Sequence, residues 1–191
     1  MSLPPTPSQT IGPFFHRALL REEMNDLTAA GAAGVRITIE GRVLDGDNAP
    51  VSDALIEIWQ ANTAGRYDHP EDRQEKKLDP NFHGYGRIGT DEHGRFRFRT
   101  IKPGPVPGNG NARQAPHINV SIFTRGLLKR LVTRIYFPDE PLSANDPVLS
   151  AIRDTSRRAT LVAHKMAAAP EPLFRFDIVL QGANETVFFD V

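Results

Sequence analysis

Several short segments of this chain alternate between polar and apolar residues, which is the pattern of a strand with one buried face. Residues 36–43 alternate in this way, and residues 95–99 alternate strictly, arginine against phenylalanine. Residues 54–60 are mostly apolar and predict a strand buried on both faces. Four more segments predict strands: residues 118–124, 131–137, 174–180 and 186–190.

The helical signal is weak and confined to two places. Residues 1–16 are rich in proline, which disfavours a regular helix and predicts an extended N-terminal arm. A short helix is predicted over residues 17–30, where leucines and a methionine recur at helical spacing. A second is predicted over residues 147–154, with Asp146 as its N-cap.

Two long segments carry neither pattern and predict loops, residues 61–86 and 103–116. Long loops in a compact domain are more often functional than not. Short strands separated by glycine and proline are typical of a β-sandwich or barrel. We therefore predict a single, mainly β domain over residues 1–191, an antiparallel β-sandwich with long loops and few short helices.

The composition excludes several classes of protein. The chain has 191 residues, and its 23 Lys plus Arg balance 23 Asp plus Glu, so the formal net charge is zero. Nucleic-acid binding normally needs a basic face, so this balance argues against such a partner. The absence of cysteine excludes disulfides, zinc knuckles and iron–sulfur clusters. Without a secretory-signal pattern or a long apolar run, we expect a cytoplasmic protein with no membrane partner.

Residue types and their spacing do not identify a reaction. The chain has no phosphate-binding loop and no Gly-x-Ser-x-Gly elbow, and its six histidines form no His-x-His or His-Glu-x-x-His pair. His117 opens a predicted strand after Pro116, which fits a structural histidine. Tyr67 and Tyr85 fit packing residues beneath the first long loop.

Positive charge gathers in one stretch of the sequence, at Arg113, Arg125, Lys129, Arg130 and Arg134. Arg125 is followed by Gly126 between two predicted strands. Its guanidinium is there either a solvated surface group or a bidentate partner for a carboxylate.

The chain also resembles the intradiol ring-cleavage dioxygenases. Residues 58–67 read Ile-Trp-Gln-Ala-Asn-Thr-Ala-Gly-Arg-Tyr, which is similar to that family's Trp-Gln-Ala-Asn…Gly-Arg-Tyr block. Further matching blocks follow at residues 79–82, 86–91, 100–104, 115–118 and 135–137. The resemblance covers most of residues 36–142 and implies an O2-dependent oxidoreductase that cleaves catechol rings.

This resemblance implies a site that has lost its metal. The family holds a non-haem ferric ion with two tyrosinates and a His-x-His pair. Tyr67 and His117 match one ligand of each type, whereas Val106 and Asn119 stand at the other two places. Valine offers no donor atom and a neutral amide is a poor replacement for imidazole on Fe(III). We expect a degenerate, iron-free site in this chain, with no catalytic residue of its own.

The two ends of the chain, residues 6–14 and 182–190, resemble the alpha subunit of a two-chain family member. For such a subunit the resemblance implies that Fe(III) is bound by a homologous beta chain, in a higher-order alpha/beta oligomer. It further implies that Thr10, Gly12, Pro13 and Arg125 line the beta chain's site. The substrates implied are protocatechuate and O2, and the product is 3-carboxy-cis,cis-muconate.

Two other interpretations remain open on the sequence. One is a stand-alone intradiol enzyme, against which the two missing ligands count. The other is a non-enzymatic binding module, because residues 41–56 also resemble general transthyretin-like sandwich domains.

Overall fold

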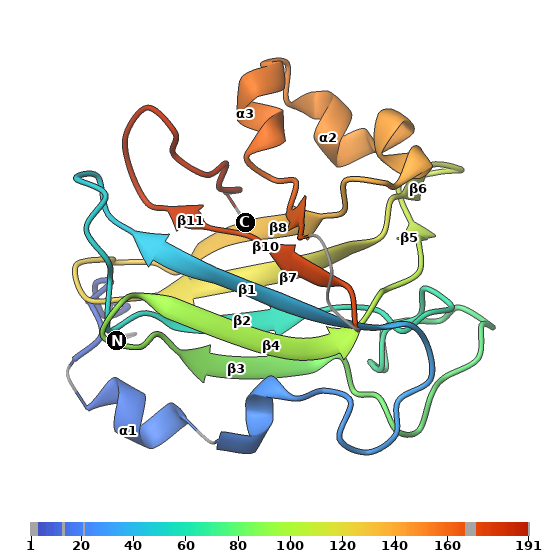
Figure 1. The fold of residues 1–191 in the computed structure, drawn as a ribbon, viewed down its shortest axis with the longest axis horizontal. Coiled ribbons are helices and arrows are strands. Elements are labelled where there is room, and N and C mark those ends of the chain that lie inside the picture. Colours follow the sequence, from blue (N-terminus) through green and yellow to red (C-terminus); the bar gives the residue numbers. More distant parts are fainter. Residues whose placement is uncertain (1–3, 13, 21, 167–170, 191) are drawn as a thin grey trace.

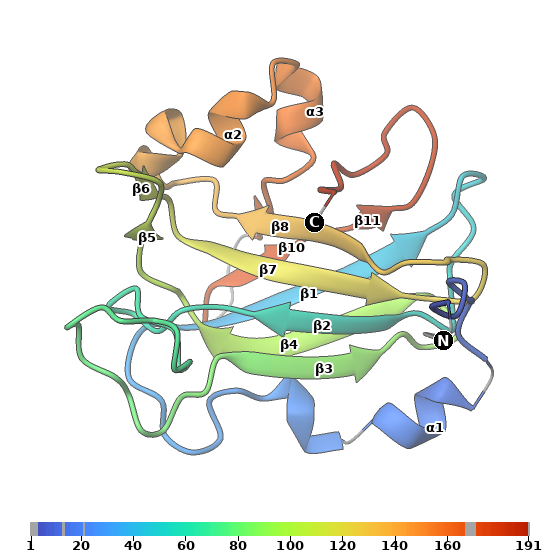
Figure 2. The same ribbon diagram turned by 180° about the vertical axis from the view of Figure 1, so that it is seen from behind.

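Two β-sheets packed face to face form the body of the molecule (Figures 1 and 2). The computed structural model describes residues 4–12, 14–20, 22–166 and 171–190. One sheet is antiparallel throughout and has the order β3 (Tyr85–Gly89), β2 (Leu55–Trp59), β7 (His117–Phe123) and β8 (Leu131–Tyr136). The other is built around β1 (Arg36–Leu44), which pairs antiparallel with β4 (Arg95–Ile101) and parallel with β10 (Leu173–Arg175) and β11 (Ile178–Val179). Strand β9 (His164–Lys165) extends that sheet beyond β10.

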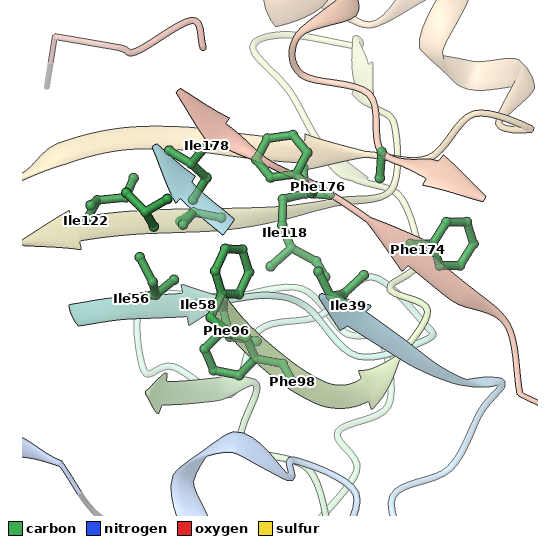
Figure 3. Packing of buried hydrophobic residues seen from close by; sticks show 14 of the residues in the cluster. Ile39, Ile56, Ile58, Phe96, Phe98, Ile118, Ile122, Phe174, Phe176 and Ile178 are labelled. Atoms are coloured by element: carbon green, nitrogen blue, oxygen red, sulfur yellow. The ribbon is translucent and has the colours of Figure 1, made fainter. Parts of the chain in front are cut away.

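The alternation in the sequence decides which side chains fill the space between the sheets. On β4, Phe96 and Phe98 are buried, whereas Arg95, Arg97 and Arg99 are exposed. On β7, Ile118, Val120 and Ile122 face the core in the same way. Figure 3 shows Phe96, Phe98, Ile118 and Ile122 gathered in one cluster with Ile56 and Ile58 of β2 and with Phe174 and Phe176. Full burial of each such side chain stabilises the fold by about 1.5–3 kcal/mol.

The predicted fold class is confirmed: the protein is mainly β, with long loops and few short helices. The pairing differs from the prediction in one respect, because β1 has parallel neighbours. The strand predicted over residues 174–180 is interrupted between β10 and β11. At this break the Asp177 carboxylate, instead of a backbone carbonyl, accepts the hydrogen bond from the Arg42 backbone N–H.

The strand predicted over residues 186–190 does not form. In this segment the Thr186 N–H donates to Val179 O of β11, and the Phe189 N–H donates to Val132 O of β8. The two bonds reach strands of different sheets, so the segment crosses the edge of the sandwich instead of joining one ladder.

Strand β3 lies at the end of the first predicted loop and was missed by the hydrophobic pattern. Its two glycines weaken the strand signal. Gly86 is needed because the chain passes closely above it: a Cβ there would lie 2.6 Å from Leu27 Cδ1 and 2.8 Å from Met24 O. The second loop contains a small hairpin of β5 (Val106–Pro107) and β6 (Arg113–Gln114).

The helices are shorter than predicted. In place of a helix over residues 17–30 the chain forms α1 (Phe15–Leu19), which begins inside the predicted arm, and the 3₁₀ helix η1 (Glu22–Asn25). A second 3₁₀ helix, η2 (Pro141–Asn145), precedes α2 (Pro147–Ala151). Asp146 caps α2 as predicted, but the helix ends at Ala151 and a separate α3 (Thr155–Ala159) follows. Within the described residues no helix is long and apolar enough to cross a membrane.

Candidate functional site

A cavity of about 400 Å³ opens at the end of the sandwich where β7 begins. Three of the four positions matched to the family's iron ligands line it, namely Tyr67, Val106 and His117. A larger hollow of about 1110 Å³ lies over β1 and β4, lined in part by Arg42, Arg95 and Asp177. None of the candidate residues lines that hollow, so the smaller cavity is the candidate site.

The register of three strands brings two residues that line this cavity, Trp59 and Arg134, to either side of Asn119. Trp59 of β2 stands opposite Asn119 of β7, which stands opposite Arg134 of β8. Residues directly opposite one another share a face of the sheet. Their chain neighbours, such as Ile58 and Ile118, point into the core, so this row lies on the outer face. The first long loop covers the row by bringing Tyr67 over Trp59, with ring centroids 5.7 Å apart and an interplanar angle of 17°.

Tyr67 is held as a neutral phenol. Its backbone N–H donates to Asp72 Oδ2 at 2.8 Å, and its hydroxyl accepts a hydrogen bond from Asn119 Nδ2 at 3.2 Å. Burial raises the pKa of the Tyr67 phenol above its ordinary value of 10.0, and the bond from Asn119 offsets only part of that effect. A metal ligand of the tyrosinate type would need the opposite shift.

His117 is buried and neutral. Its side chain lies at the start of β7, and the residue is 3% exposed. Burial lowers the pKa of His117 from 6.5 to about 4, and the positive charge of Arg134 adds to this effect. Nδ1 lies 2.7 Å from the Ala115 carbonyl oxygen, so Nδ1 carries the proton and donates, and Nε2 is the acceptor.

These residues do not fit a ferric ion. Val106 lines the cavity without a donor atom. The Asn119 amide nitrogen points at Tyr67 and at the Trp59 carbonyl oxygen, 3.3 Å away, and an amide N–H is not a metal ligand. Within the described residues no group of three or more His, Asp and Glu side chains has the arrangement of a metal site.

Arg134 is the cation that lines the cavity. Nothing in the sequence distinguishes it from the other basic residues near it. Its Nη1 donates to Gln114 Oε1 at 2.6 Å and to the Tyr136 hydroxyl at 3.3 Å. The Tyr136 hydroxyl in turn donates to Asp146 Oδ1 at 3.3 Å. Trp59, Gln114 and Arg134 come together only through strand register and the β5–β6 hairpin, which composition and spacing do not reveal.

The other predicted site residues lie at the opposite end of the molecule. Thr10 Oγ1 accepts a hydrogen bond from the Gly126 N–H at 2.8 Å, which ties the arm to the β7–β8 connection. Arg125 forms an ion pair with Asp53, and its side chain is 66% exposed. Gly12 is exposed, with open space where a Cβ would lie. Pro13 lies outside the described residues.

Strand β7 separates the residues that line the cavity from Thr10, Gly12 and Arg125. It runs from His117 at the cavity to Phe123 just before Arg125, and seven residues at about 3.3 Å each span roughly 20 Å. Figure 1 shows the β5–β6 hairpin at one end of the strand and the β7–β8 connection at the other. Arg125 and the arm therefore cannot reach this chain's own cavity.

Comparisons with known proteins identify the family and agree with the fold. The family model described as "Dioxygenase" matches residues 11–182. The protocatechuate 3,4-dioxygenase alpha chain of Burkholderia cepacia is 41% identical over 203 residues, covering 100% of this chain and 99% of that protein. The beta chain from the same organism is 45% identical over 158 residues, covering 80% of this chain and 67% of its own length. A solved dioxygenase domain from Streptomyces sp. SirexAA-E superposes with a TM-score of 0.64 at 30% identity, covering 94% of this chain and all of that one.

The likeness to the alpha chain includes both ends of the sequence, whereas the likeness to the beta chain covers a shorter span at slightly higher identity. The resemblance to an alpha subunit read from residues 6–14 and 182–190 is thereby confirmed. The relatives are ring-cleaving dioxygenases, which favours an enzyme over a general sandwich module.

Proposed function

This chain belongs to the intradiol dioxygenase family, and from that premise we propose that it is the alpha subunit of a protocatechuate 3,4-dioxygenase. The observation that carries the proposal is the cavity at the start of β7, which Val106 lines without a donor atom and beside which the Asn119 amide donates to Tyr67. The resemblance matches these two residues to iron-ligand positions. The family is iron-dependent, so an active enzyme needs a second chain to supply the metal. The proposed partner is a homologous beta chain that binds Fe(III).

The reaction proposed for the assembled enzyme is intradiol cleavage of protocatechuate with O2, giving 3-carboxy-cis,cis-muconate. Protocatechuate carries a carboxylate, and an exposed guanidinium is a suitable partner for it. Arg125 has that character, because its side chain is 66% exposed and its partner Asp53 lies at the same surface. In this proposal Arg125 orients the substrate carboxylate from across the subunit interface.

The arm is proposed to form part of the wall of the beta chain's site. The bond from the Gly126 N–H to Thr10 Oγ1 holds the arm beside Arg125. Gly12 has no neighbouring atom within 4 Å of the Cβ position, so another chain's backbone can approach it closely. Such a wall would position the substrate and limit the access of water.

A stand-alone enzyme fits the structure less well. Within the described residues the cavity offers no ligand set for a metal, and Arg125, the group proposed for the substrate carboxylate of the assembled enzyme, lies roughly 20 Å away at the other end of β7. One chain cannot bring them together, whereas two homologous chains placed side by side can.

Oxygen uptake with protocatechuate tests the proposal. The chain purified alone should consume no O2 above background, and co-purification with a beta chain should give full activity. Cleavage of protocatechuate by the isolated chain would contradict the subunit assignment.

A further inference from the structure

The cavity at the start of β7 has the walls of a site for a flat ligand. Trp59 and Tyr67 stack at its edge, and Val106 and Pro107 add apolar surface from the β5–β6 hairpin. Its volume of about 400 Å³ lies in the range of small-molecule pockets. Aromatic and aliphatic side chains around such a volume favour a planar ring.

Arg134 gives the cavity a positive charge that no carboxylate neutralises directly. The half-buried guanidinium donates to Gln114 and to Tyr136, both neutral. The buried acid nearest in this network is Asp146, separated from Arg134 by the Tyr136 hydroxyl. The Asp146 oxygens already accept the backbone N–H groups of Ala115, Val148 and Leu149. A ligand carboxylate is the partner that this guanidinium lacks within the described part of the chain.

His117 and Tyr67 provide hydrogen-bonding positions for a hydroxyl. The proton of His117 lies on Nδ1, which donates to Ala115, so Nε2 is an acceptor with no partner among the described residues. The Tyr67 hydroxyl accepts from Asn119, which leaves its own proton free to donate. A hydroxyl on the ligand ring can therefore donate to the imidazole and accept from the phenol.

Two acids, Asp72 and Glu71, also line the cavity, but neither offsets the preference of the Arg134 guanidinium for a ligand carboxylate. Asp72 accepts hydrogen bonds from Tyr67, from the Gln74 backbone and from the Gln74 side chain. The positive charge of Arg66 acts on the same carboxylate. Glu71 lies at the surface, 79% exposed, with Arg73 at 4.0 Å.

We propose that this cavity binds a small aromatic carboxylate bearing a ring hydroxyl, without a metal and without converting it. The carboxylate pairs with Arg134, the ring packs against the Trp59–Tyr67 wall, and the hydroxyl bonds to His117. The site belongs to this chain alone. The iron content and assembly-dependent activity of the alpha/beta pair, which test the proposed subunit role, do not depend on it.

Trp59 is the chain's single tryptophan and lines the cavity, so its fluorescence reports on binding. Titration of the full-length chain with 4-hydroxybenzoate should give a saturable change in emission. Arg134→Gln should weaken binding by about tenfold or more, because a charge-assisted pair is lost. Arg95→Gln, at an exposed position on β4 away from the cavity, is the matched control and should bind like the wild type. Catechol, which has no carboxylate, should bind much more weakly than 4-hydroxybenzoate.

A second variant covers the case in which Arg134→Gln does not fold. Val106→Phe fills the cavity from the hairpin and should abolish the emission change while every polar group stays in place. The absence of saturation with the folded wild-type chain would overturn the proposal. Equal affinity for catechol and 4-hydroxybenzoate, or unchanged binding in a folded Arg134→Gln or Val106→Phe variant, would also overturn it.

Discussion

At the scale of single residues, burial of Tyr67 sets the protonation state of the phenol in the candidate site. Burial beside Trp59 keeps this phenol protonated, because it raises the pKa by more than the hydrogen bond from Asn119 lowers it. At the two other positions that the resemblance matches to iron ligands, Val106 has no donor atom and Asn119 offers only an amide. The sequence assigns these positions through the resemblance, and the assignment stays a prediction. The sequence did not predict the roles of Arg134 and Gln114, because no motif records which strand positions stand opposite each other.

His117 should make the chain sensitive to acid. The folded-state pKa of about 4 lies below the ordinary 6.5, so the unfolded chain takes up a proton at a higher pH than the folded one. The associated stability is present above pH 6.5 and is lost as the pH falls toward 4, by about 3 kcal/mol in total.

Urea unfolding at several pH values between 7.5 and 4.5 measures this effect. His117→Gln should show a shallower fall in the free energy of unfolding over this range than the wild type. The exposed His93→Gln variant controls for the loss of a histidine at the surface. Parallel curves for the wild type and His117→Gln would show that the imidazole is not buried neutral.

Arg125→Ala in the assembled enzyme should mainly weaken substrate binding. The loss of one charge-assisted contact costs about 1.5–3 kcal/mol, or roughly 10- to 150-fold in affinity. The loss should be larger for protocatechuate than for catechol, which has no carboxylate. Arg130→Ala, at an exposed position in the same connection, is the control. Equal losses for the two substrates would make Arg125 a structural residue.

At the scale of elements, the alternation of polar and apolar residues predicted the strands that have one buried face. It failed where a side-chain hydrogen bond or close packing takes the place of regular strand pairing. Strands β1, β4 and β7 alternate in burial, and these three strands and β8 were predicted within a few residues. Strand β3 was missed because close packing of residues 24–27 demands Gly86, which weakens the strand pattern. The break between β10 and β11 depends on a hydrogen bond from Arg42 to the Asp177 side chain, a contact 135 residues apart in sequence that no local pattern reveals.

Asp146 should be the most important cap in the fold. It is fully buried, starts α2 by accepting from Val148 and Leu149, and also accepts from Ala115 across the molecule. Asp146→Ala would leave several buried N–H groups without a partner, which should cost about 2–4 kcal/mol. Asp154→Ala, at the exposed cap of α3, should cost much less. Thermal unfolding of both variants compares the two, and similar losses would contradict the role given to burial.

At the scale of the whole molecule, the chain presents two surfaces at opposite ends of one strand. The cavity lies where β7 begins, and Arg125 and the contact between Thr10 and Gly126 lie where it ends. Figure 2 shows the β5–β6 hairpin and the β7–β8 connection at opposite ends of this strand. The sandwich between them could be predicted from short apolar and alternating segments separated by glycine and proline. The position of the arm and Arg125 far from the cavity could not be predicted, because residues 10 and 126 become neighbours only in the folded chain.

Deletion of residues 1–13 should leave the sandwich folded and able to pair with a beta chain. Residues 4–10 and Gly12 are exposed, so the arm adds little to the core. Turnover or substrate affinity of the assembled enzyme should fall, because the site would lose part of its wall. Size-exclusion chromatography and steady-state kinetics of the truncated complex measure both. Full assembly with unchanged kinetics would remove the arm from the active site.

The iron content of the purified chain, alone and co-purified with a beta chain, tests the central claim most directly. Elemental analysis with a visible absorption spectrum should find no stoichiometric iron and no tyrosinate-to-iron band in the chain alone. The alpha/beta pair should contain about one iron per pair, all of it on the beta chain, because Val106 and Asn119 leave this chain's cavity without a complete ligand set. Near-stoichiometric iron and a tyrosinate band in the isolated chain would contradict the account.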